Sequence, residues 1–303
     1  MFFRRIKRVL RRYADLPSRI NKIQEALGRI EGRQVAANDT GSNAREFRVF
    51  SQWGEDGIIQ HLIRSVPIAR KLFVEFGVEN YVEANTRFLL TNDHWTGLVI
   101  DGSRSNIEFI KRDPIYWACN LKAEHSFVTR ENINDILTRA GITGDIGLLS
   151  IDIDGNDYWV WEAIESISPR LVICEYNCQF GPTARVSTPY DPLFVRENAH
   201  HSKIYYGASI AALNSLAESR NYSLVAANRA GNNVFFARND VRGSLPVRSC
   251  SDAYRRSSFR EYHDEKGVLT FDDFETRVKK IGQLPVYDFD SKSLRQIVDV
   301  VDT

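Results

Sequence analysis

The 303-residue chain has few of the residues and patterns that mark an extracellular or membrane-embedded protein. It has four cysteines and no C-x-x-C pair, which argues against a disulfide scaffold in a chain of this length. No apolar run reaches the roughly 18 residues that a membrane-spanning helix needs. The amino-terminal stretch is basic, but it lacks the apolar core and the small-residue cleavage site of a signal peptide. We therefore expect a globular protein of the reducing cytoplasm.

Basic residues outnumber acidic ones in the first twelve residues but not in the rest of the chain. The whole chain has 40 lysines and arginines and 39 acidic residues, for a formal net charge of +1. Residues 1–12 hold six of the basic residues and no acid, so the remainder carries 34 basic and 39 acidic side chains. An acidic body argues against nucleic acid as a partner, because binding phosphates requires a positive face.

Residues 1–34 have the pattern of a basic, amphipathic, coiled-coil-like helix. Apolar side chains recur at alternating intervals of three and four, at Ile6, Val9, Tyr13, Leu16, Ile20, Ile23, Leu27 and Ile30. Because Pro17 would interrupt one continuous helix, we expect Asp15 to cap a helix that begins near it. Three interpretations stay open: a helix packed on the body or a frayed tail, a homo-oligomer held through residues 6–30, or residues 1–13 lying on the inner face of a membrane.

The rest of the chain is predicted to be one α/β domain with appendages. A polar linker covers residues 35–46, and apolar strands alternate with amphipathic helices over residues 47–240. Five apolar strands are expected at 71–78, 96–103, 116–123, 146–154 and 170–177. Such strands, separated by helices, indicate a mostly parallel, Rossmann-like sheet covered on both faces. We expect residues 223–238 to close the sheet with an antiparallel pair, and residues 241–303 to form a C-terminal helical extension.

Two predicted strand ends carry residues suited to an adenosine-containing cofactor, because ligands bind beyond the carboxyl ends of open parallel sheets. After the first strand come Gly77 and Asn80, and a glycine there lets the backbone approach a ligand closely. The second strand ends at Asp101-Gly102, where a carboxylate can accept hydrogen bonds from both ribose hydroxyls. Alternatively, Glu75 and Asp101 only cap the helices that follow.

The glycine pattern discriminates between cofactors. A dinucleotide needs the glycines of a G-x-G-x-x-G turn to bind its pyrophosphate, and here only Gly77 is present. S-adenosylmethionine contains no phosphate, and its sulfonium is a cation that carboxylates can face. The sequence therefore favours S-adenosylmethionine.

A second acidic group follows the fourth and fifth predicted strands. Because side chains alternate across a strand, Asp152 and Asp154 are expected to share one direction. Glu175 and Asn177 are expected to do the same on the next strand. Converging carboxylates are unfavourable unless a proton, a cation or a metal lies between them, and such tension is typical of functional sites. The alternative is that the residues from Asp154 to Asp157 only cap a helix.

Over residues 47–240 the chain resembles the FkbM-type S-adenosylmethionine-dependent methyltransferases. The resemblance is carried by FSQWGEDGII (50–59), VEFGVENYVEANTRFLL (74–90), GLVIDGS (97–103), LLSIDIDGNDYWVW (148–161) and VICEYN (172–177). It implies a class I methyltransferase fold, in which Gln52, Glu55 and Asp56 close over the cofactor. The residues expected to bind the cofactor are Gln52, Glu75, Gly77, Asn80, Asp101, Gly102 and Asp152.

The acidic pattern is also similar to that of metal-dependent sugar O-methyltransferases of the macrocin type. That similarity implies that Asp152 and Glu175 hold Mg²⁺ and that Asp154 is the general base. The macrocin-type pattern has a second acid where this chain has Tyr176. In the segment after the fifth strand, His201 is a further candidate base. The residues expected to line the acceptor are Asn177, Tyr190 and Tyr206.

We therefore expect an S-adenosylmethionine-dependent methyltransferase that methylates a hydroxyl of a sugar or glycan-linked acceptor. One alternative is a nicotinamide-dependent oxidoreductase, although the chain has no Tyr-x-x-x-Lys pair at the expected place, since Glu162 stands four residues after Tyr158. The other is a non-catalytic scaffold with a methyltransferase fold.

Overall fold

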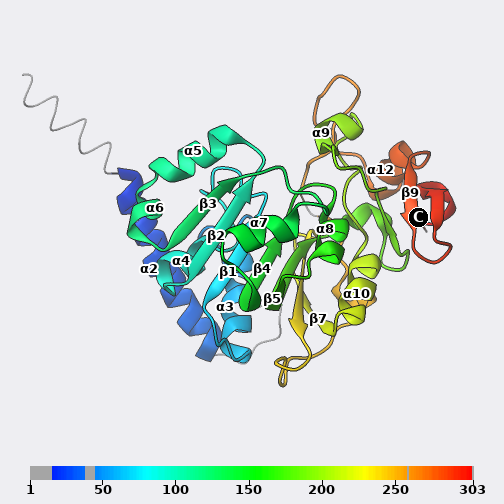
Figure 1. Ribbon diagram of the computed structural model, residues 1–303. Coiled ribbons are helices and arrows are strands. Elements are labelled where there is room, and N and C mark those ends of the chain that lie inside the picture. Colours follow the sequence, from blue (N-terminus) through cyan, green and yellow to red (C-terminus); the bar gives the residue numbers. More distant parts are fainter. Residues whose placement is uncertain (1–15, 38–44, 258, 302–303) are drawn as a thin grey trace, which may run out of the picture.

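A computed structural model describes residues 16–37, 45–257 and 259–301 of the chain (Figure 1). Within these ranges, seven strands form one sheet in the order β3-β2-β1-β4-β5-β8-β7. Their bounds are β1 Leu72–Phe76, β2 Thr96–Asp101, β3 Leu121–His125, β4 Gly144–Ile151, β5 Ile167–Glu175, β7 Tyr222–Ala227 and β8 Asn233–Arg238. Strands β1 to β5 pair in parallel, whereas β8 is antiparallel to both β5 and β7. The predicted Rossmann-like sheet with an antiparallel closing strand is confirmed.

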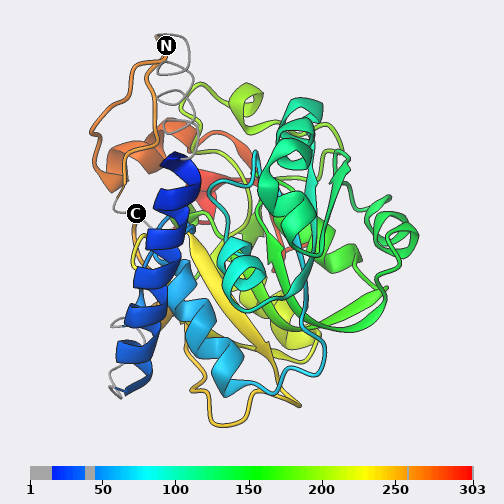
Figure 2. The same ribbon diagram turned by 90° about the vertical axis from the view of Figure 1, so that its left-hand side faces the viewer.

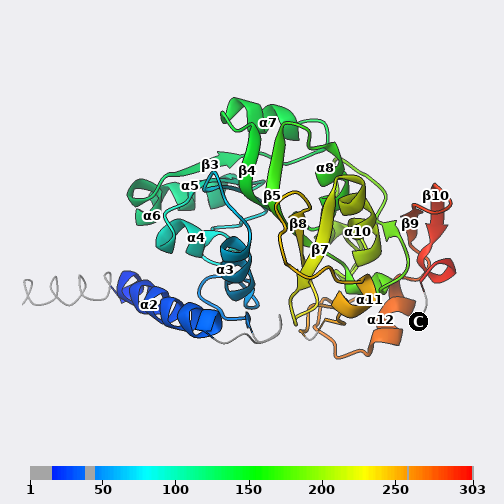
Figure 3. The same ribbon diagram turned by 90° about the horizontal axis from the view of Figure 1, so that it is seen from below.

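Helices cover both faces of the sheet (Figure 3). Helices α3 (Glu55–Ser65), α4 (Arg87–Asn92) and α5 (Arg104–Arg112) pack on one face, and α7 (Ile133–Arg139), α8 (Asp157–Ala163) and α10 (Ile210–Ser219) on the other. In β1, Phe73 belongs to the apolar core that includes residues of α3, α4 and α5, and Val74 belongs to the core that includes residues of α7, α8 and α10. Both side chains are fully buried. Burial on both faces is why the strands are continuous apolar runs rather than alternating ones.

The predicted third strand, 116–123, began too early. Residues Pro114–Ala118 form helix α6 instead, and the strand starts at Leu121. Asp113 caps this helix by accepting a hydrogen bond from the Ile115 amide, and Pro114 occupies the first turn. Both features favour a helix start, because proline has no amide hydrogen to leave unpaired there.

The C-terminal segment, residues 241–303, was predicted to be helical, and this is wrong in part because the segment also contains a β-hairpin. Its elements are α11 (Cys250–Ala253), α12 (Phe274–Ile281), β9 (Pro285–Asp288), β10 (Ser293–Gln296) and η3 (Ile297–Asp299). Among the described residues, β10 and β9 form a three-stranded sheet with β6 (Val186–Ser187), which belongs to the segment after β5 together with η2 (Cys178–Phe180) and α9 (Arg196–Ala199). A separate apolar core joins both segments, with Phe180 and Val186 packed against Ile281 and Val286.

Helix α2 (Leu16–Ala37) lies along the outside of the molecule against α3 and α4 (Figure 2). Its described part starts at Leu16, next to Pro17, and Asp15, which was predicted to cap it, lies with the basic segment outside the described residues. Most of the predicted linker also lies outside them, and α2 extends into its first residues. None of the helices in the described ranges is both long and apolar enough to cross a bilayer.

Candidate active site

Two adjoining cavities lie at the carboxyl ends of the central strands. The first has a volume of about 250 Å³ and the second about 160 Å³. Gly77, Glu79, Asp152 and Asp154 line both, so the two cavities share a wall at the ends of β1 and β4. This is the edge at which parallel sheets bind ligands, and it is where the sequence analysis placed the cofactor.

The first cavity is strongly acidic. Among the described residues that line it, the charged ones are Glu75, Glu79, Glu83, Asp152, Asp154, Glu175 and Arg196. Gln52, Asn85 and Asn233 add amide groups. One cation faces six carboxyl groups, so the cavity favours cationic ligands and hydrogen-bond donors and disfavours anions.

The second cavity combines the shared carboxylates of Glu79, Asp152 and Asp154 with one further acid, Asp101, and with apolar side chains. Asp101 and Gly102 line it together with Phe127, Val128 and Ile153. The Oδ1 atom of Asp101 accepts hydrogen bonds from the Ser103 amide at 2.7 Å and from Asn106 Nδ2 at 3.0 Å. Among the described residues no hydrogen bond ends on its Oδ2 atom. Asp101 is therefore held in place through one oxygen and offers the other to a ligand.

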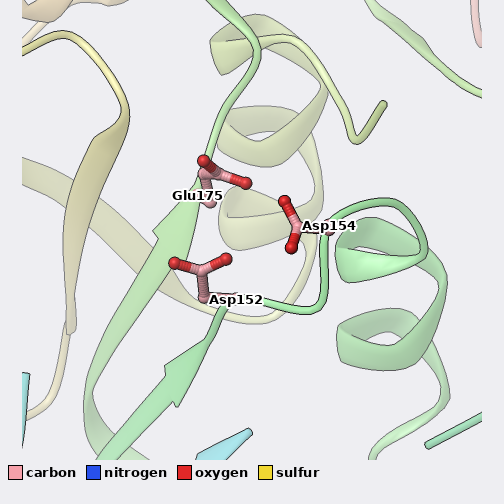
Figure 4. Close-up of side chains that lie close together, drawn as sticks. All are labelled: Asp152, Asp154 and Glu175. Carbon is pink, nitrogen blue, oxygen red and sulfur yellow. The ribbon is translucent and has the colours of Figure 1, made fainter. Parts of the chain in front are cut away.

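Three carboxylates converge between β4 and β5 (Figure 4). One oxygen from each of Asp152, Asp154 and Glu175 lies within 4.8 Å of the others. Burial raises the pKa of both Asp152 and Glu175 well above their ordinary values, and repulsion from neighbouring carboxylates raises them further. Among the described residues, the buried Oε2 of Glu175 has no hydrogen-bond partner. A cation at this position would relieve both the repulsion and the unpaired oxygen.

The convergence of Asp152 and Asp154 has a different cause from the one predicted. Strand β4 ends at Ile151, so strand alternation does not set their directions. Asp154 has a positive φ of 56°, and the following turn is held by Asp157, which accepts the amides of Ile153 at 2.9 Å and Gly155 at 3.0 Å. Asp157 thus stabilises the turn that carries Asp154 rather than a helix terminus, and burial raises its pKa to about 6.

Gly77 is required for packing as well as for its backbone conformation. Its φ is +69°, a region that favours glycine, and a Cβ there would lie 1.5 Å from the Asp152 carbonyl oxygen. Gly77 therefore allows a close approach of the neighbouring strand end, and it also lines both cavities, where the approach of a ligand stays a prediction. It brings the turn after β1 directly against the acidic group after β4.

Three of the predicted acids, Glu55, Asp56 and Glu75, accept hydrogen bonds from backbone amides. Glu75 accepts the amides of Asn85 at 2.9 Å and Thr86 at 3.2 Å, just before α4, and burial raises its pKa to about 7. Asp56 accepts three consecutive amides of residues 49–51, each at 2.8 Å. Glu55 accepts the Trp53 amide at 2.8 Å and also a side-chain hydrogen bond from Asn233 Nδ2 at 3.0 Å. Of the three residues expected to close over the cofactor, Gln52 lines the first cavity, whereas Glu55 and Asp56 shape the loop that positions it.

Five polar residues of the first cavity were not predicted as site residues, namely Glu79, Glu83, Asn85, Arg196 and Asn233. Arg196 forms ion pairs with Asp154 and Glu261, both at 2.6 Å, and its guanidinium lies 3.7 Å from the centre of the Tyr206 ring. Asn233 stands opposite Glu175 where β8 pairs with β5, and its buried Oδ1 has no partner among the described residues. Asn233 belongs to the predicted closing strands, and Glu79, Glu83 and Asn85 lie within the motif of residues 74–90, whereas Arg196 lies in none of the quoted motifs.

Several predicted site residues line neither cavity. The side chain of Asn80 accepts a hydrogen bond from the Val82 amide. The side chain of Asn177 donates hydrogen bonds to the backbone carbonyls of residues 204 and 206. Tyr190 bonds Glu131, and Tyr206 is buried beneath Arg196. The exposed His201 packs against His200, with ring centres 4.1 Å apart. The structure thus brings together Gln52, Glu75, Gly77, Asp101, Gly102, Asp152, Asp154 and Glu175, and leaves the others outside the cavities.

No family model matches the chain, and no curated protein matches it. Among solved structures, it is similar to the N-terminal domain of EvdMO1 with S-adenosylhomocysteine bound, at 10% identity and a TM-score of 0.40, covering 61% of this chain and 80% of that one. It is also similar to M. capricolum TrmK in complex with S-adenosylhomocysteine, at 11% identity and a TM-score of 0.37, covering 64% and 74%. A third is the O-methyltransferase from Bacillus cereus in complex with S-adenosylhomocysteine, at 13% identity and a TM-score of 0.36, covering 55% and 72%.

Proposed function

We propose that this chain is an S-adenosylmethionine-dependent methyltransferase that methylates a hydroxyl group of a sugar or glycan-linked acceptor. The observation that carries the proposal is the pair of cavities that share the wall made by Gly77, Glu79, Asp152 and Asp154. The first is lined mostly by acids and amides, and the second adds Asp101 and apolar side chains. The first cavity suits a sulfonium and an acceptor, and the second cavity suits an adenosine.

The second cavity is assigned to the adenosine. The Oδ2 atom of Asp101 would accept hydrogen bonds from the ribose hydroxyls, and Phe127, Val128 and Ile153 would contact the apolar faces of the adenine ring. The methionine part would continue past Gly77 into the first cavity. There the carboxylates would stabilise the sulfonium, because a cation close to several acids is favoured in a partly desolvated site.

The same features oppose a nicotinamide dinucleotide. Its pyrophosphate would carry negative charge into a cavity lined by Asp152 and Glu175, both of which are already destabilised by neighbouring acids. Gly77 packs against Asp152, and the turn lacks the further glycines that a pyrophosphate loop uses.

The polar first cavity supports a hydroxylated acceptor. Carboxylates and amides such as Glu83 and Asn85 match the hydrogen-bond donors of a sugar, and an anionic acceptor would be repelled. In the reaction, the acceptor oxygen attacks the methyl carbon, the carbon–sulfur bond breaks, and its electron pair stays on sulfur. Asp154, whose side chain is 49% exposed, would take the hydroxyl proton. Positioning of the three atoms in line supplies much of the acceleration.

A divalent metal is a further part of this proposal. Asp152 and Glu175 would hold it through carboxylate oxygens, the donor type that Mg²⁺ prefers, and one oxygen from each lies within 4.8 Å of the other and of Asp154. The unpartnered Oδ1 of Asn233 adds another oxygen donor in the same cavity. The metal would polarise the acceptor hydroxyl, whereas without it Arg196 is the cation that balances Asp154. Titration with EDTA distinguishes these cases: loss of turnover that Mg²⁺ restores supports the metal, and unchanged turnover removes it.

The cofactor assignment is tested by isothermal titration with S-adenosylhomocysteine and with NAD. We expect binding of the first and none of the second. Asp101→Ala should abolish cofactor binding, whereas Asp154→Ala should preserve binding and remove turnover. The reverse outcome would overturn these roles, and a protein that binds neither ligand would favour a non-catalytic scaffold. The acceptor itself is best sought as a metabolite that loses one methyl group in a deletion strain.

A further inference from the structure

Helix α2 contacts the body through its least apolar face. The buried residues of α2 on this side are Gly28 and Gly32, flanked by the half-buried Asn21, Glu25 and Val35. A Cβ on Gly28 would lie 2.4 Å from Val49, and the carbonyl of Gly32 accepts a hydrogen bond from Arg64 at 2.7 Å. These contacts are close and include backbone, so they fix which face of α2 points outward.

The outward face carries the aliphatic residues. The exposed fractions are 45% for Leu16, 47% for Ile20, 60% for Ile23, 54% for Leu27 and 50% for Ile30. Helices that pack on a globular body normally bury such a stripe and expose the polar side. Here the arrangement is inverted, which indicates that another surface covers the stripe.

We propose that α2 pairs with α2 of a second copy of this chain as a parallel, in-register coiled coil. The spacing of the stripe alternates between four and three residues, which gives the a and d positions of a heptad, with Ile20 and Leu27 at a. Such a seam occupies two positions in seven and fits the groove of another helix. A helix lying on a membrane has a broader apolar face, whereas this seam is flanked by Arg19, Glu31 and Arg33.

The flanking charges select the parallel orientation. In a parallel pair each g residue faces the e residue five positions later in the partner, so Arg19 would face Gln24 and Ala26 would face Glu31. In the antiparallel alignment with the longest overlap of α2, g residues face each other, and Arg19 would oppose Arg33 at both ends. Like charges there disfavour the antiparallel form.

The heptad pattern of apolar residues also occurs in the sequence before α2. In the sequence, Ile6, Val9 and Tyr13 stand at the same heptad positions, so the repeat extends over about four heptads. This proposal is independent of the proposed function, because the seam lies on the opposite side of α2 from its contacts with the body.

The first experiment measures the mass of the full-length protein by sedimentation equilibrium over a range of concentrations. We expect a monomer–dimer equilibrium that Ile23→Glu with Leu27→Glu weakens by roughly tenfold or more, because charges would be buried in the seam. Ser18→Glu with Lys22→Glu adds two acids at exposed positions off the seam and should leave the dimer intact. Circular dichroism checks that both variants stay folded. A wild-type protein that is monomeric throughout, or a dimer insensitive to the seam variant, would overturn the proposal.

The second experiment tests orientation. A parallel, in-register pair places residue 23 of one copy beside residue 23 of the other, so Ile23→Cys should give a disulfide-linked dimer on mild oxidation. Lys22→Cys, off the seam, should not exceed the wild-type background from the native cysteines. Failure of Ile23→Cys to cross-link above this background overturns the parallel register. Monomeric protein that instead sediments with anionic vesicles through the same seam shows a membrane surface as the occupant and also overturns the proposal.

Discussion

At the scale of single residues, the unusual feature is the crowding of Asp152, Asp154 and Glu175. Burial and mutual repulsion raise the pKa of Asp152 and of Glu175 well above the ordinary values of 3.8 and 4.5. A bound cation lowers these pKa values, so its binding and the loss of protons are linked.

The first prediction is that the preference for S-adenosylmethionine over S-adenosylhomocysteine grows with pH. Below the raised pKa values the acids are protonated and attract the sulfonium weakly, and above them they are ionised and attract it strongly. S-adenosylhomocysteine has no sulfonium charge and serves as the matched ligand. Isothermal titration of both ligands between roughly pH 5 and 9 gives the affinity ratio. Glu175→Gln should make this affinity ratio depend less on pH. A ratio that does not change with pH in the wild type would contradict the placement of the sulfonium beside Asp152 and Glu175.

The second prediction concerns the ribose. Asp101→Asn keeps an oxygen for the Ser103 amide and replaces only the oxygen that faces the second cavity. A hydrogen bond to a charged group contributes about 1.5–3 kcal/mol, so S-adenosylhomocysteine should bind about ten to a hundred times more weakly. Glu108→Gln, an exposed change on the following helix, is the control and should bind normally. Equal affinities for the two variants would exclude Asp101 from the site.

At the scale of elements, turns and helix starts position the site. The turn after β1 packs against Asp152 through Gly77, and Glu75 at the end of β1 holds the start of α4 through the amides of Asn85 and Thr86. The sequence interpretation of Glu75 as a residue that only caps the next helix was therefore partly correct, because the carboxylate also lines the first cavity.

The third prediction follows from the pKa of Glu75, which burial raises from 4.5 to about 7. The folded protein holds this proton more tightly than the unfolded chain, so its contribution to stability is full below about pH 4.5 and is lost as pH rises through about 7. The loss is on the order of 3 kcal/mol. Glu75→Gln removes this dependence, so urea unfolding without ligands should show the wild-type advantage shrinking as pH rises. Glu108→Gln should show no such trend, and a parallel offset at all pH values for Glu75→Gln would contradict the prediction.

At the scale of the whole molecule, the C-terminal segment completes a core that the segment after β5 begins. The apolar cluster of Phe180, Val186 and Ile204 is closed by Ile281 and Val286. Arg196 adds a polar link, because it joins Asp154 at the cavity to Glu261 in the C-terminal segment. The extension is therefore expected to unfold together with the sheet.

The fourth prediction tests this cooperativity. Ile281→Ala removes a fully buried side chain and should lower the free energy of unfolding by about 2–5 kcal/mol. Trp53 and Trp159 contact Phe259 and Phe289 of the extension, so both are first replaced by phenylalanine in all variants compared. The fluorescence of the remaining tryptophans, which include the fully buried Trp95 and Trp161, then reports the rest of the protein and should shift with Ile281→Ala. Leu294→Ala, where the side chain is 62% exposed on the same extension, is the control and should have little effect. An unshifted fluorescence transition in Ile281→Ala would show that the extension unfolds separately.

The sequence by itself determined the parallel sheet, its closing strands and the strand ends that carry Asp101, Asp152 and Glu175. Continuous apolar runs report burial on both faces of a sheet, and strand ends follow directly from where those runs stop. It also showed the heptad pattern of α2, because that pattern is local.

Only the tertiary structure decided which side chains meet. Arg196 and Asn233 reach the first cavity from segments distant in the chain, while His201 and Tyr190, from the same segment as Arg196, do not line it. The outward direction of the α2 seam likewise depends on glycine contacts with the body. Local periodicity reports how a residue is buried, but meetings across long sequence separations depend on how loops pack, and no local pattern encodes that.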